Sequence, residues 1–242
     1  MKSNNSKKYL GRLRRKVGSA INDYTMIEAN DSVLVAFSGG KDSMVLLDAI
    51  AQRRIHMPVD YTIHAAYVYV TNFTNGNEIE HYRSFCQSYN IDFHVCRVTL
   101  DFSDTSKAPC FICSWHRRKN LFTLARDLGC QKIAFGHHRD DILETFIMNM
   151  VYHGNMSTMP PRLKLFDGEM EIIRPLAYLS EKEVIWYRNL KEFTEYENKC
   201  PYKTDSKRSD VKEMLKQCDR LYKNARTNIF RSLSHRLDDY LL

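Results

Sequence analysis

Short apolar runs of strand length alternate with longer helix-like stretches along most of this chain, and this alternation restricts the fold more than any other feature. The strand-like runs Val33–Phe37, Tyr61–Val70 and Phe93–Leu100 are each followed by a helical stretch. Such alternation is typical of a parallel sheet with right-handed crossovers and helices on both faces. We therefore expect an α/β fold whose ligands bind at the carboxyl ends of the strands. The other predicted strands are Lys132–Phe135 and Glu171–Pro175, and the predicted helices are Lys8–Ile27, Met44–Gln52, Asn77–Tyr89, Ser114–Leu128, Asp140–Tyr152 and Ser180–Phe193.

The positive charge of the chain is concentrated near its two ends. Among its 242 residues, 36 Lys and Arg exceed 29 Asp and Glu by seven, and the first nineteen positions hold seven basic residues and no acid. A second basic stretch, Lys203 to Arg236, has ten Lys and Arg against four Asp and Glu. Both stretches fit a polyanionic partner, and both also fit a solvated surface.

The sequence also indicates where the protein works. No apolar region follows the basic residues near its start, so we expect no secretory signal, and no run reaches the roughly 18 apolar residues that a membrane span needs. Seven cysteines, an odd count, argue against a disulfide framework and favour thiol or metal chemistry. We expect a cytoplasmic protein with no membrane partner.

The turn after the first strand is a candidate phosphate site. Ser38-Gly39-Gly40-Lys41-Asp42-Ser43 combines two glycines and a lysine with the free N–H groups of a helix start, which can hold phosphate. It is not a Walker A loop, because that pattern needs Gly at Val35 and Ser or Thr at Asp42. The strand end at Ala36 and Phe37 is included in the predicted nucleotide-binding residues.

Three cysteines form a second candidate site. Cys110-Phe-Ile-Cys113 opens a basic helix, and Cys200 precedes a proline ninety residues later. A zinc site is disfavoured because a fourth ligand at suitable spacing is missing, whereas a redox pair and an iron–sulfur cluster with one open iron both remain. The other four cysteines, predicted to be ordinary thiols, are Cys86, Cys96, Cys130 and Cys218.

His137-His138 and Asp140-Asp141 lie between a predicted strand end and a helix start, where a ligand crevice is expected. The histidines are candidates to contact a nucleotide or a base. The two acids are candidates to bind Mg²⁺ or to cap the helix.

Several linked motifs resemble those of the tRNA 2-thiocytidine synthetase family of PP-loop, or N-type, ATP pyrophosphatases, from about Leu10 to about Arg231. The resemblance implies the Rossmann-like sheet of the adenine nucleotide alpha-hydrolases with helical N- and C-terminal extensions. It divides the chain into a basic arm at 1–28, an ATP pyrophosphatase domain at 29–178 and a helical region at 179–242. The matching segments are Ser38–Ser43, Cys110–Arg118, Lys132–Leu143, Met159–Pro161 and Ile173–Ala177.

The resemblance also implies a reaction. ATP adenylates the C2 oxygen of a cytidine at anticodon-loop position 32 of tRNA, and sulfur then replaces that oxygen. A [4Fe-4S] cluster on Cys110, Cys113 and Cys200, whose fourth iron accepts the sulfur, takes part in the transfer, and Asp42 helps to hold Mg²⁺. The residues assigned to catalysis are Lys41, Asp42, His137, Asp140 and Asp141.

The partners implied are tRNA and a sulfur donor such as a cysteine desulfurase, and the family often forms homodimers. Basic residues would contact tRNA phosphates, which set affinity without reading sequence. The predicted tRNA-binding residues are Arg12, Arg14, Arg15, Lys16, Arg117 and Arg118.

Two departures from the family pattern leave alternatives open. Family members usually have a second CxxC, but here the segment reads Cys200-Pro-Tyr-Lys203. The loop Thr71–Gly76 lacks the acidic, proline-containing form of the family, which puts the substrate nucleotide in question. The alternatives are thiolation of uridine or another substrate, transfer through a persulfide on Cys110 or Cys113 resolved by Cys200, and a redox-sensing RNA-binding module without thiolase activity.

Overall fold

The structure, a computed structural model, describes residues 2–56, 59–74, 76–103, 106, 108–196, 200–202, 207–235 and 237–240. The chain divides into two compact units. The first unit comprises Met1–His138 with Pro161–Lys203, and the second comprises Arg139–Pro160 with Thr204–Leu242. The division at residues 28 and 178 stays a prediction, since it separates the chain by function and not by compactness.

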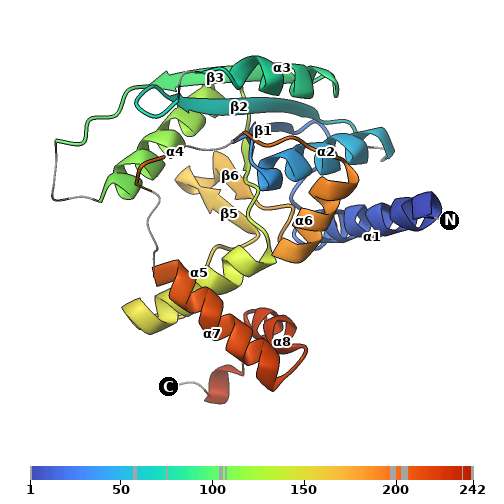
Figure 1. The fold of residues 1–242 in the computed structure, drawn as a ribbon, viewed down its shortest axis with the longest axis vertical. Coiled ribbons are helices and arrows are strands. Elements are labelled where there is room, and N and C mark those ends of the chain that lie inside the picture. Colours follow the sequence, from blue (N-terminus) through green and yellow to red (C-terminus); the bar gives the residue numbers. More distant parts are fainter. Residues whose placement is uncertain are drawn as a thin grey trace. The chain divides into compact units, whose positions relative to one another are not determined.

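The described elements alternate as expected (Figure 1). In the first unit they are α1 (Lys2–Asp23), β1 (Ser32–Ala36), α2 (Lys41–His56), β2 (Thr62–Val70), α3 (Ile79–Gln87), β3 (Asp92–Val98), α4 (Pro109–Asp127), β4 (Lys132–Ala134), β5 (Arg162–Leu165), η1 (Phe166–Gly168), β6 (Met170–Ile173) and α6 (Glu181–Leu190). In the second unit they are α5 (Arg139–His153), α7 (Lys207–Leu221), α8 (Ala225–Ser232) and η2 (Asp238–Tyr240). None of these described helices is long and apolar enough to cross a membrane.

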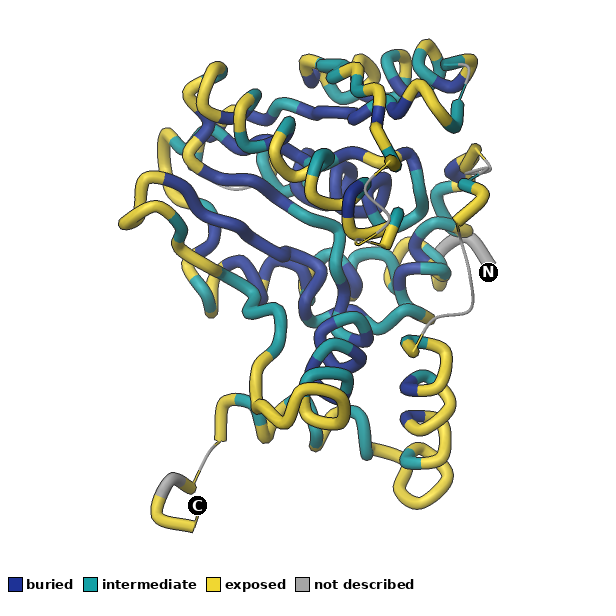
Figure 2. Tube along the Cα trace, turned by 90° about the vertical axis from the view of Figure 1, so that its left-hand side faces the viewer, coloured by how far each residue is buried: buried dark blue, intermediate teal, exposed yellow. Residues whose placement is uncertain are grey.

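The described residues of the first unit form a six-stranded sheet in the order β3-β2-β1-β4-β6-β5. The first five strands in this order are parallel, and β5 joins the edge antiparallel to β6. Successive side chains of β1 point to opposite faces, so Val35 packs in the core with α2 while Leu34 packs in the core with α4. The predicted sheet with helices on both faces is confirmed. The central strands β1, β4 and β6 are buried along most of their length (Figure 2).

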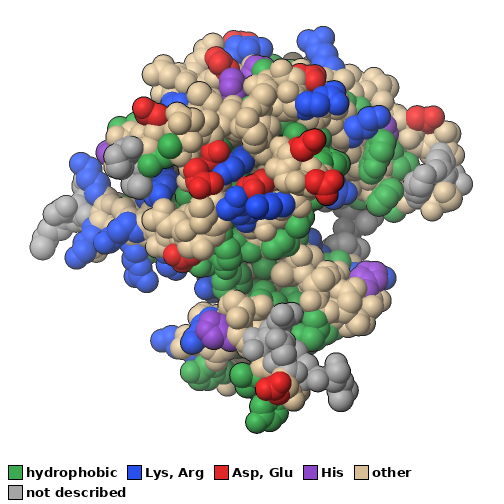
Figure 3. Space-filling view, turned by 180° about the vertical axis from the view of Figure 1, so that it is seen from behind, with side chains coloured by type: hydrophobic (Ala, Val, Ile, Leu, Met, Phe, Trp, Pro, Cys, Tyr) green, Lys and Arg blue, Asp and Glu red, His purple; other side chains and the backbone are tan. Residues whose placement is uncertain are grey.

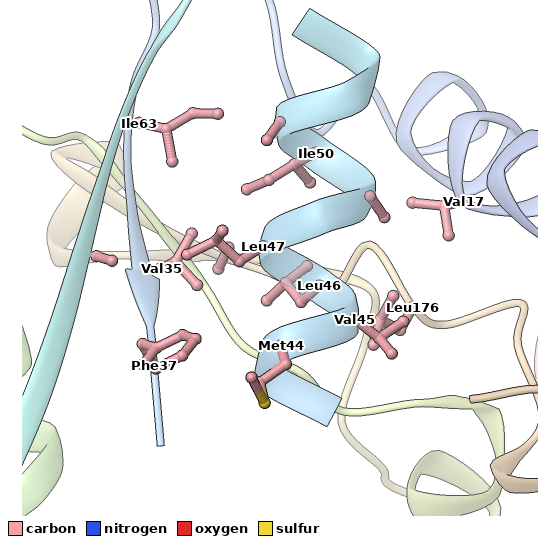
Figure 4. Packing of buried hydrophobic residues seen from close by; sticks show 14 of the residues in the cluster. Val17, Val35, Phe37, Met44, Val45, Leu46, Leu47, Ile50, Ile63 and Leu176 are labelled. Carbon is pink, nitrogen blue, oxygen red and sulfur yellow. The ribbon is translucent and has the colours of Figure 1, made fainter. Parts of the chain in front are cut away.

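Helix α2 is buried on nearly all sides, from Ser43 to Ala51. One side faces β1, where Leu47 lies near Val35, and the other faces α1 and the turn before α6, where Val45 lies near Leu176 (Figure 4). The N-terminal turn of α2, which completes the candidate phosphate loop Ser38–Ser43, is therefore held rigidly by the largest apolar core of the unit.

One buried carboxylate joins the helices on this side of the sheet. Asp48 of α2, fully buried, accepts hydrogen bonds from Arg14 at 2.9 Å and Tyr187 at 2.5 Å. It also accepts one from Tyr89 at 2.8 Å, and Lys191 Nζ lies 3.1 Å away. Burial by itself would raise the pKa of Asp48, but the hydrogen bonds from Tyr187 and Arg14 and the two positive charges outweigh it and lower the pKa.

Two local predictions about helix ends are also confirmed. The Ser180 side chain accepts from the Glu183 N–H while the Glu183 side chain accepts from the Ser180 N–H, which is a capping box. Gly129 follows α4 with φ +67°, the left-handed conformation that glycine adopts most readily.

The second unit has a small apolar core between α5 and α7. Leu143, Phe146 and Ile147 pack there against Val211 and Leu215. Its ion pairs join the acidic first turn of α5 to arginines of α7 and α8, as described below for the site residues.

Candidate functional site

The phosphate loop closes upon itself through its two serines. The Ser38 N–H donates to Ser43 Oγ at 3.1 Å, and the Ser43 hydroxyl donates to the Gly40 carbonyl at 2.9 Å. Upstream, the N–H of buried Phe37 donates to the Ala66 carbonyl of β2, which continues the strand ladder to the edge of the loop. The loop is thus fixed at both ends before any ligand binds.

Gly39 is required by both conformation and space. Its φ is +75°, and a Cβ at this position would lie 2.0 Å from the hydroxyl oxygen of Tyr82. Tyr82 in turn packs edge-on against Phe37 and Tyr67, with ring centroids 5.4 and 5.2 Å away. Tyr82 of α3, held by these two rings, therefore packs directly against the backbone of the loop.

The end of β4 packs against the start of α2. A Cβ on Gly136 would lie 3.0 Å from the backbone of Asp42, so the two segments approach backbone to backbone. His138 Nε2 lies 3.9 Å from Asp42 Oδ1, and Lys41 Nζ lies 3.2 Å from Asp42 Oδ2. His138 is 3% exposed. The predicted catalytic residue His137 stacks on Phe135 with ring centroids 5.6 Å apart, so His138 is the histidine that the structure brings to Asp42. The sequence does not indicate which of these two adjacent histidines faces the loop.

The side-chain carboxylate of Glu195 lies at the N-terminus of α2. Glu195 Oε2 accepts a hydrogen bond from the Lys41 N–H at 2.9 Å, and Glu195 Oε1 lies 3.2 Å from Arg188 Nε. An N–H at the start of a helix is a position where phosphate oxygens bind. Glu195 thus fills one anion position of the loop. The sequence gave no signal for this contact, because 154 residues separate its two partners.

The candidate cysteines come from two segments that touch. Cys110 and Cys113 lie in the first turns of α4, and the Cys110 thiol donates to the Tyr202 carbonyl at 3.5 Å. The Tyr202 ring packs 5.3 Å from Phe102. These aromatic and hydrogen-bond contacts place the segment that begins at Cys200 beside the start of α4.

The loop that departs from the family pattern supports this segment. Phe73 packs against the rings of Phe102 and Tyr202 at centroid distances of 5.7 and 5.9 Å. Asn72 exchanges two hydrogen bonds with the backbone of Leu100. Of the predicted loop Thr71–Gly76, only Asn75 lies outside the described residues.

The three candidate thiols fit a cysteine-ligated metal group by their chemistry. None is in a disulfide; Cys110 is exposed and Cys113 and Cys200 are half-buried. By contrast Cys86 is fully buried, and burial raises the pKa of its thiol to about 12, which makes it a poor ligand. Within the described ranges, no three Cys, His, Asp or Glu side chains are arranged to hold a metal ion. The thiols are therefore available but not assembled.

The two predicted acids of α5 are engaged in ion pairs of the second unit. Asp140 Oδ1 lies 3.0 Å from Arg226 Nη1, and Asp141 Oδ1 lies 3.3 Å from Arg208 Nη1. Arg208 also lies 3.7 Å from the buried Glu144. These contacts tie α5 to α7 and α8, so both acids have a structural role, and their role in catalysis stays a prediction.

The basic residues of α1 differ in their surroundings. Arg12 and Arg15 are exposed. Lys and Arg side chains gather over α1 (Figure 3). Arg14 donates to Asp48 and Tyr187, and Lys16 Nζ lies 2.6 Å from Glu183 Oε1. Arg14 and Lys16 therefore pack α1 onto α2 and α6.

Of the two predicted basic residues of α4, Arg118 is exposed and Arg117 is half-buried. The Nε atom of Arg117 is buried and has no hydrogen-bond partner within the described part of the chain. tRNA binding stays a prediction for all six basic residues.

Comparison with known proteins gives consistent results. The PP-loop domain family matches residues 10–218. The chain is 38% identical over 239 residues to the tRNA-cytidine(32) 2-sulfurtransferase of Shewanella baltica, covering 96% of this chain and 76% of that protein. It is 37% identical to the protein of the same name from Pseudomonas putida, covering 96% and 86%.

Among solved structures, the fold is similar to that of the U34-tRNA thiolase NcsA from Methanococcus maripaludis with its [4Fe-4S] cluster. The TM-score is 0.79 at 23% identity, and the match covers 98% of this chain and 81% of that one.

Proposed function

The chain belongs to the PP-loop domain family and, within it, to the tRNA-cytidine(32) 2-sulfurtransferase family, and we propose that it uses ATP to replace the C2 oxygen of a tRNA cytidine by sulfur. The family resemblance drawn from the motifs is confirmed. The proposal rests most heavily on one observation: a closed phosphate loop and three thiols outside any disulfide occur in the same compact unit.

The phosphate loop binds the β- and γ-phosphates of ATP in this proposal. Glu195 leaves the Lys41 N–H as a phosphate oxygen arrives, since one N–H cannot hold both at full strength. Lys41 adds a positive charge beside the phosphates, and the Asp42 carboxylate offers the oxygen ligands that Mg²⁺ prefers. Adenylation then makes the C2 oxygen of the base a good leaving group, because it departs as part of AMP.

His138 has a positioning role in this reading. It lies against Asp42 from the end of β4, where little solvent reaches it. A buried neighbour of this kind fixes the orientation of a metal-binding carboxylate.

Cys110, Cys113 and Cys200 would hold the [4Fe-4S] cluster. When bound, the cluster supplies an iron site that three protein thiolates leave open to the sulfur to be transferred. The chain itself contributes the thiolates, and the aromatic contacts of Tyr202 keep the Cys200 segment within reach of α4.

The partners follow from this chemistry. A sulfur donor such as a cysteine desulfurase supplies sulfur, tRNA phosphates contact the exposed Arg12, Arg15 and Arg118, and the protein works in the cytoplasm as a monomer or homodimer. The target base must leave the anticodon-loop stack to reach the phosphate loop.

The test is mass spectrometry of tRNA nucleosides from cells with and without the gene. We expect 2-thiocytidine to disappear on deletion and to return when the gene is restored. Loss of a thiolated uridine instead would transfer the proposal to that base, and an unchanged nucleoside profile would contradict thiolation.

A further inference from the structure

A concave surface lies in the first unit, away from the phosphate loop. This groove has a volume of about 950 Å³ and runs between α4 and the hairpin β5–β6. Its floor is one face of the hairpin, where Leu163, Leu165, Met170 and Ile172 alternate with side chains that point to the other face. Leu163 is 36% exposed and Leu165 is half-buried, so the groove exposes apolar surface to solvent.

Exposed aromatic rings border this groove. Trp115 of α4 is 47% exposed, and Phe166 at the hairpin turn is 62% exposed. The Phe166 ring meets Phe122 edge-on at 6.0 Å. Phe122 is half-buried, whereas Trp115 and Phe166 expose much of their apolar surface, which is typical of a binding surface.

The backbone that presents Phe166 is strained. Phe166, Asp167 and Gly168 have φ values of +52°, +54° and +95° in succession. The left-handed region is costly for a bulky aromatic residue, and such strain is concentrated at functional sites. The hairpin thus holds an apolar ring in solvent at a conformational cost, which favours a ligand that the ring contacts.

The α4 side of the groove is basic. Arg118, Lys119 and Arg126 line it, against a single lining acid, Glu169. Lys119 Nζ lies 5.3 Å from the centre of the Trp115 ring, so charge and aromatic surface are combined in one patch. The occupant should be anionic. A second copy of this chain, with a net charge of +7, would bring like charge to the groove.

We propose that this groove is an RNA-binding platform, in which the aromatic rings stack on unpaired bases and the α4 cations bind phosphates. The identification of the RNA as tRNA rests on the proposed function. The groove and the thiols share helix α4: at 1.5 Å per residue, Cys113 and Arg126 lie about 20 Å apart along it. A strand whose target base is held near the cysteines can therefore continue along α4.

The first experiment uses Trp115 as its own reporter. The chain has two tryptophans, and the other, Trp186, packs against Tyr9 outside the groove. In the Trp186→Phe protein, titration with unmodified tRNA should quench the emission of Trp115. The fluorescence anisotropy of labelled tRNA shows independently when the tRNA is bound. The proposal would be overturned if the tRNA were bound and the emission of Trp115 did not change.

The second experiment compares two substitutions in the groove lining with one on β5 outside it. Lys119→Glu should weaken tRNA binding several-fold and reduce the slope of log affinity against log salt by about 1 or more. Phe166→Ala should weaken binding roughly tenfold through lost stacking. Lys164→Glu is the matched control, because Lys164 is an exposed residue of β5 that lies outside the groove lining, and it should leave the affinity nearly unchanged.

The outcomes separate this proposal from the proposed function. If the wild-type protein binds tRNA through the groove but forms no thiolated base, thiolation fails and the platform stands. If it thiolates tRNA while Lys119→Glu and Phe166→Ala bind like the wild type, the platform is refuted. A Phe166→Ala variant that loses a dimer seen by sedimentation, with unchanged tRNA affinity, would make the groove an interface between copies and would also refute it.

Discussion

The phosphate loop and the cysteine segments belong to the same compact unit but differ in how completely the polypeptide assembles them. The loop is closed by hydrogen bonds between Ser38, Gly40 and Ser43 and is continuous with the buried helix α2. The thiols of Cys110 and Cys200 are exposed or half-buried, and their segments meet through one long hydrogen bond and a few ring contacts.

The difference has a physical cause. Backbone groups at a strand–helix turn must be satisfied by the fold itself, so a phosphate site is built with the core. A metal site receives its binding energy from the metal, so its ligands need no fixed arrangement beforehand. On the proposed function, ATP would therefore meet a preformed site, whereas the metal group would organise its own ligands.

The largest expected effect tests the unassembled site. Cys113→Ala should lower iron content and tRNA thiolation by roughly 100-fold or more. Even the loss of a side chain that only hydrogen-bonds to a metal ligand lowers metal affinity or activity by about 10- to 100-fold. The thermal midpoint of the apoprotein should hardly change, because Cys113 is outside the apolar cores.

The matched control is Cys96→Ala, whose half-buried thiol has a pKa raised by burial and lies on β3. It should keep both iron and activity. A Cys113→Ala protein that thiolates tRNA normally would remove the cluster from the account, and one that unfolds would show that the cysteine site is as preassembled as the loop.

The next effect tests the rigidity behind the phosphate loop. Asp48→Asn leaves Arg14 and Lys191 without their buried counter-charge and should cost about 3 kcal/mol of unfolding free energy. The exposed Asp92, whose replacement by Asn should cost little, is the control. Urea denaturation at neutral pH measures both.

The Asp48 carboxylate should also make the free energy of unfolding depend on pH. The pKa of Asp48 is lower in the folded chain than the unfolded value of about 3.9, so the unfolded state binds more protons in this range. The stabilisation is therefore full above about pH 4 and is lost as the pH falls through the folded pKa. The gap in stability between wild type and Asp48→Asn should narrow on acidification, and a gap independent of pH would contradict this role.

A smaller effect distinguishes the two requirements for glycine at position 39, its positive φ and the lack of space for a Cβ atom. Gly39→Ala should lose about 2 kcal/mol of stability and bind ATP more weakly, because the new Cβ meets Tyr82 and φ is positive. Gly154→Ala, at φ +62° with no atom within 4 Å, should show only the backbone cost of about 1 kcal/mol. Calorimetry of ATP binding together with denaturation distinguishes the two. Equal losses in both variants would mean that Tyr82 does not restrict the loop.

The smallest effect concerns the carboxylate at the helix start. Glu195→Gln removes a charge that competes with phosphate and should tighten ATP binding about fivefold, equivalent to about 1 kcal/mol. Glu192→Gln, an exposed neighbour, should leave the affinity for ATP unchanged. Weaker ATP binding in Glu195→Gln would show that Glu195 supports the nucleotide and does not compete with it.

What could be predicted from the sequence follows the range of the interactions involved. The loop Ser38–Ser43 and the capping box at Ser180 are set by residues a few positions apart, so their patterns are visible locally. Strand β5 was missed because it has four residues and lies at the sheet edge, where the burial pattern is weak. The choice of His138 over His137 as the neighbour of Asp42, and the contact of Glu195 with Lys41, depend on tertiary packing and have no local signal.

The central claim is that this chain thiolates a cytidine of tRNA with ATP at a preformed loop and with sulfur at the three cysteines. The most direct measurement incubates the full chain, reconstituted anaerobically with iron and sulfide, with unmodified tRNA and a sulfur source, with and without ATP, and analyses the nucleosides by mass spectrometry. We predict 2-thiocytidine only when ATP is present, with AMP formed in equal amount. Its absence from a protein that holds iron and binds both ATP and tRNA, or its formation without ATP, would contradict the account.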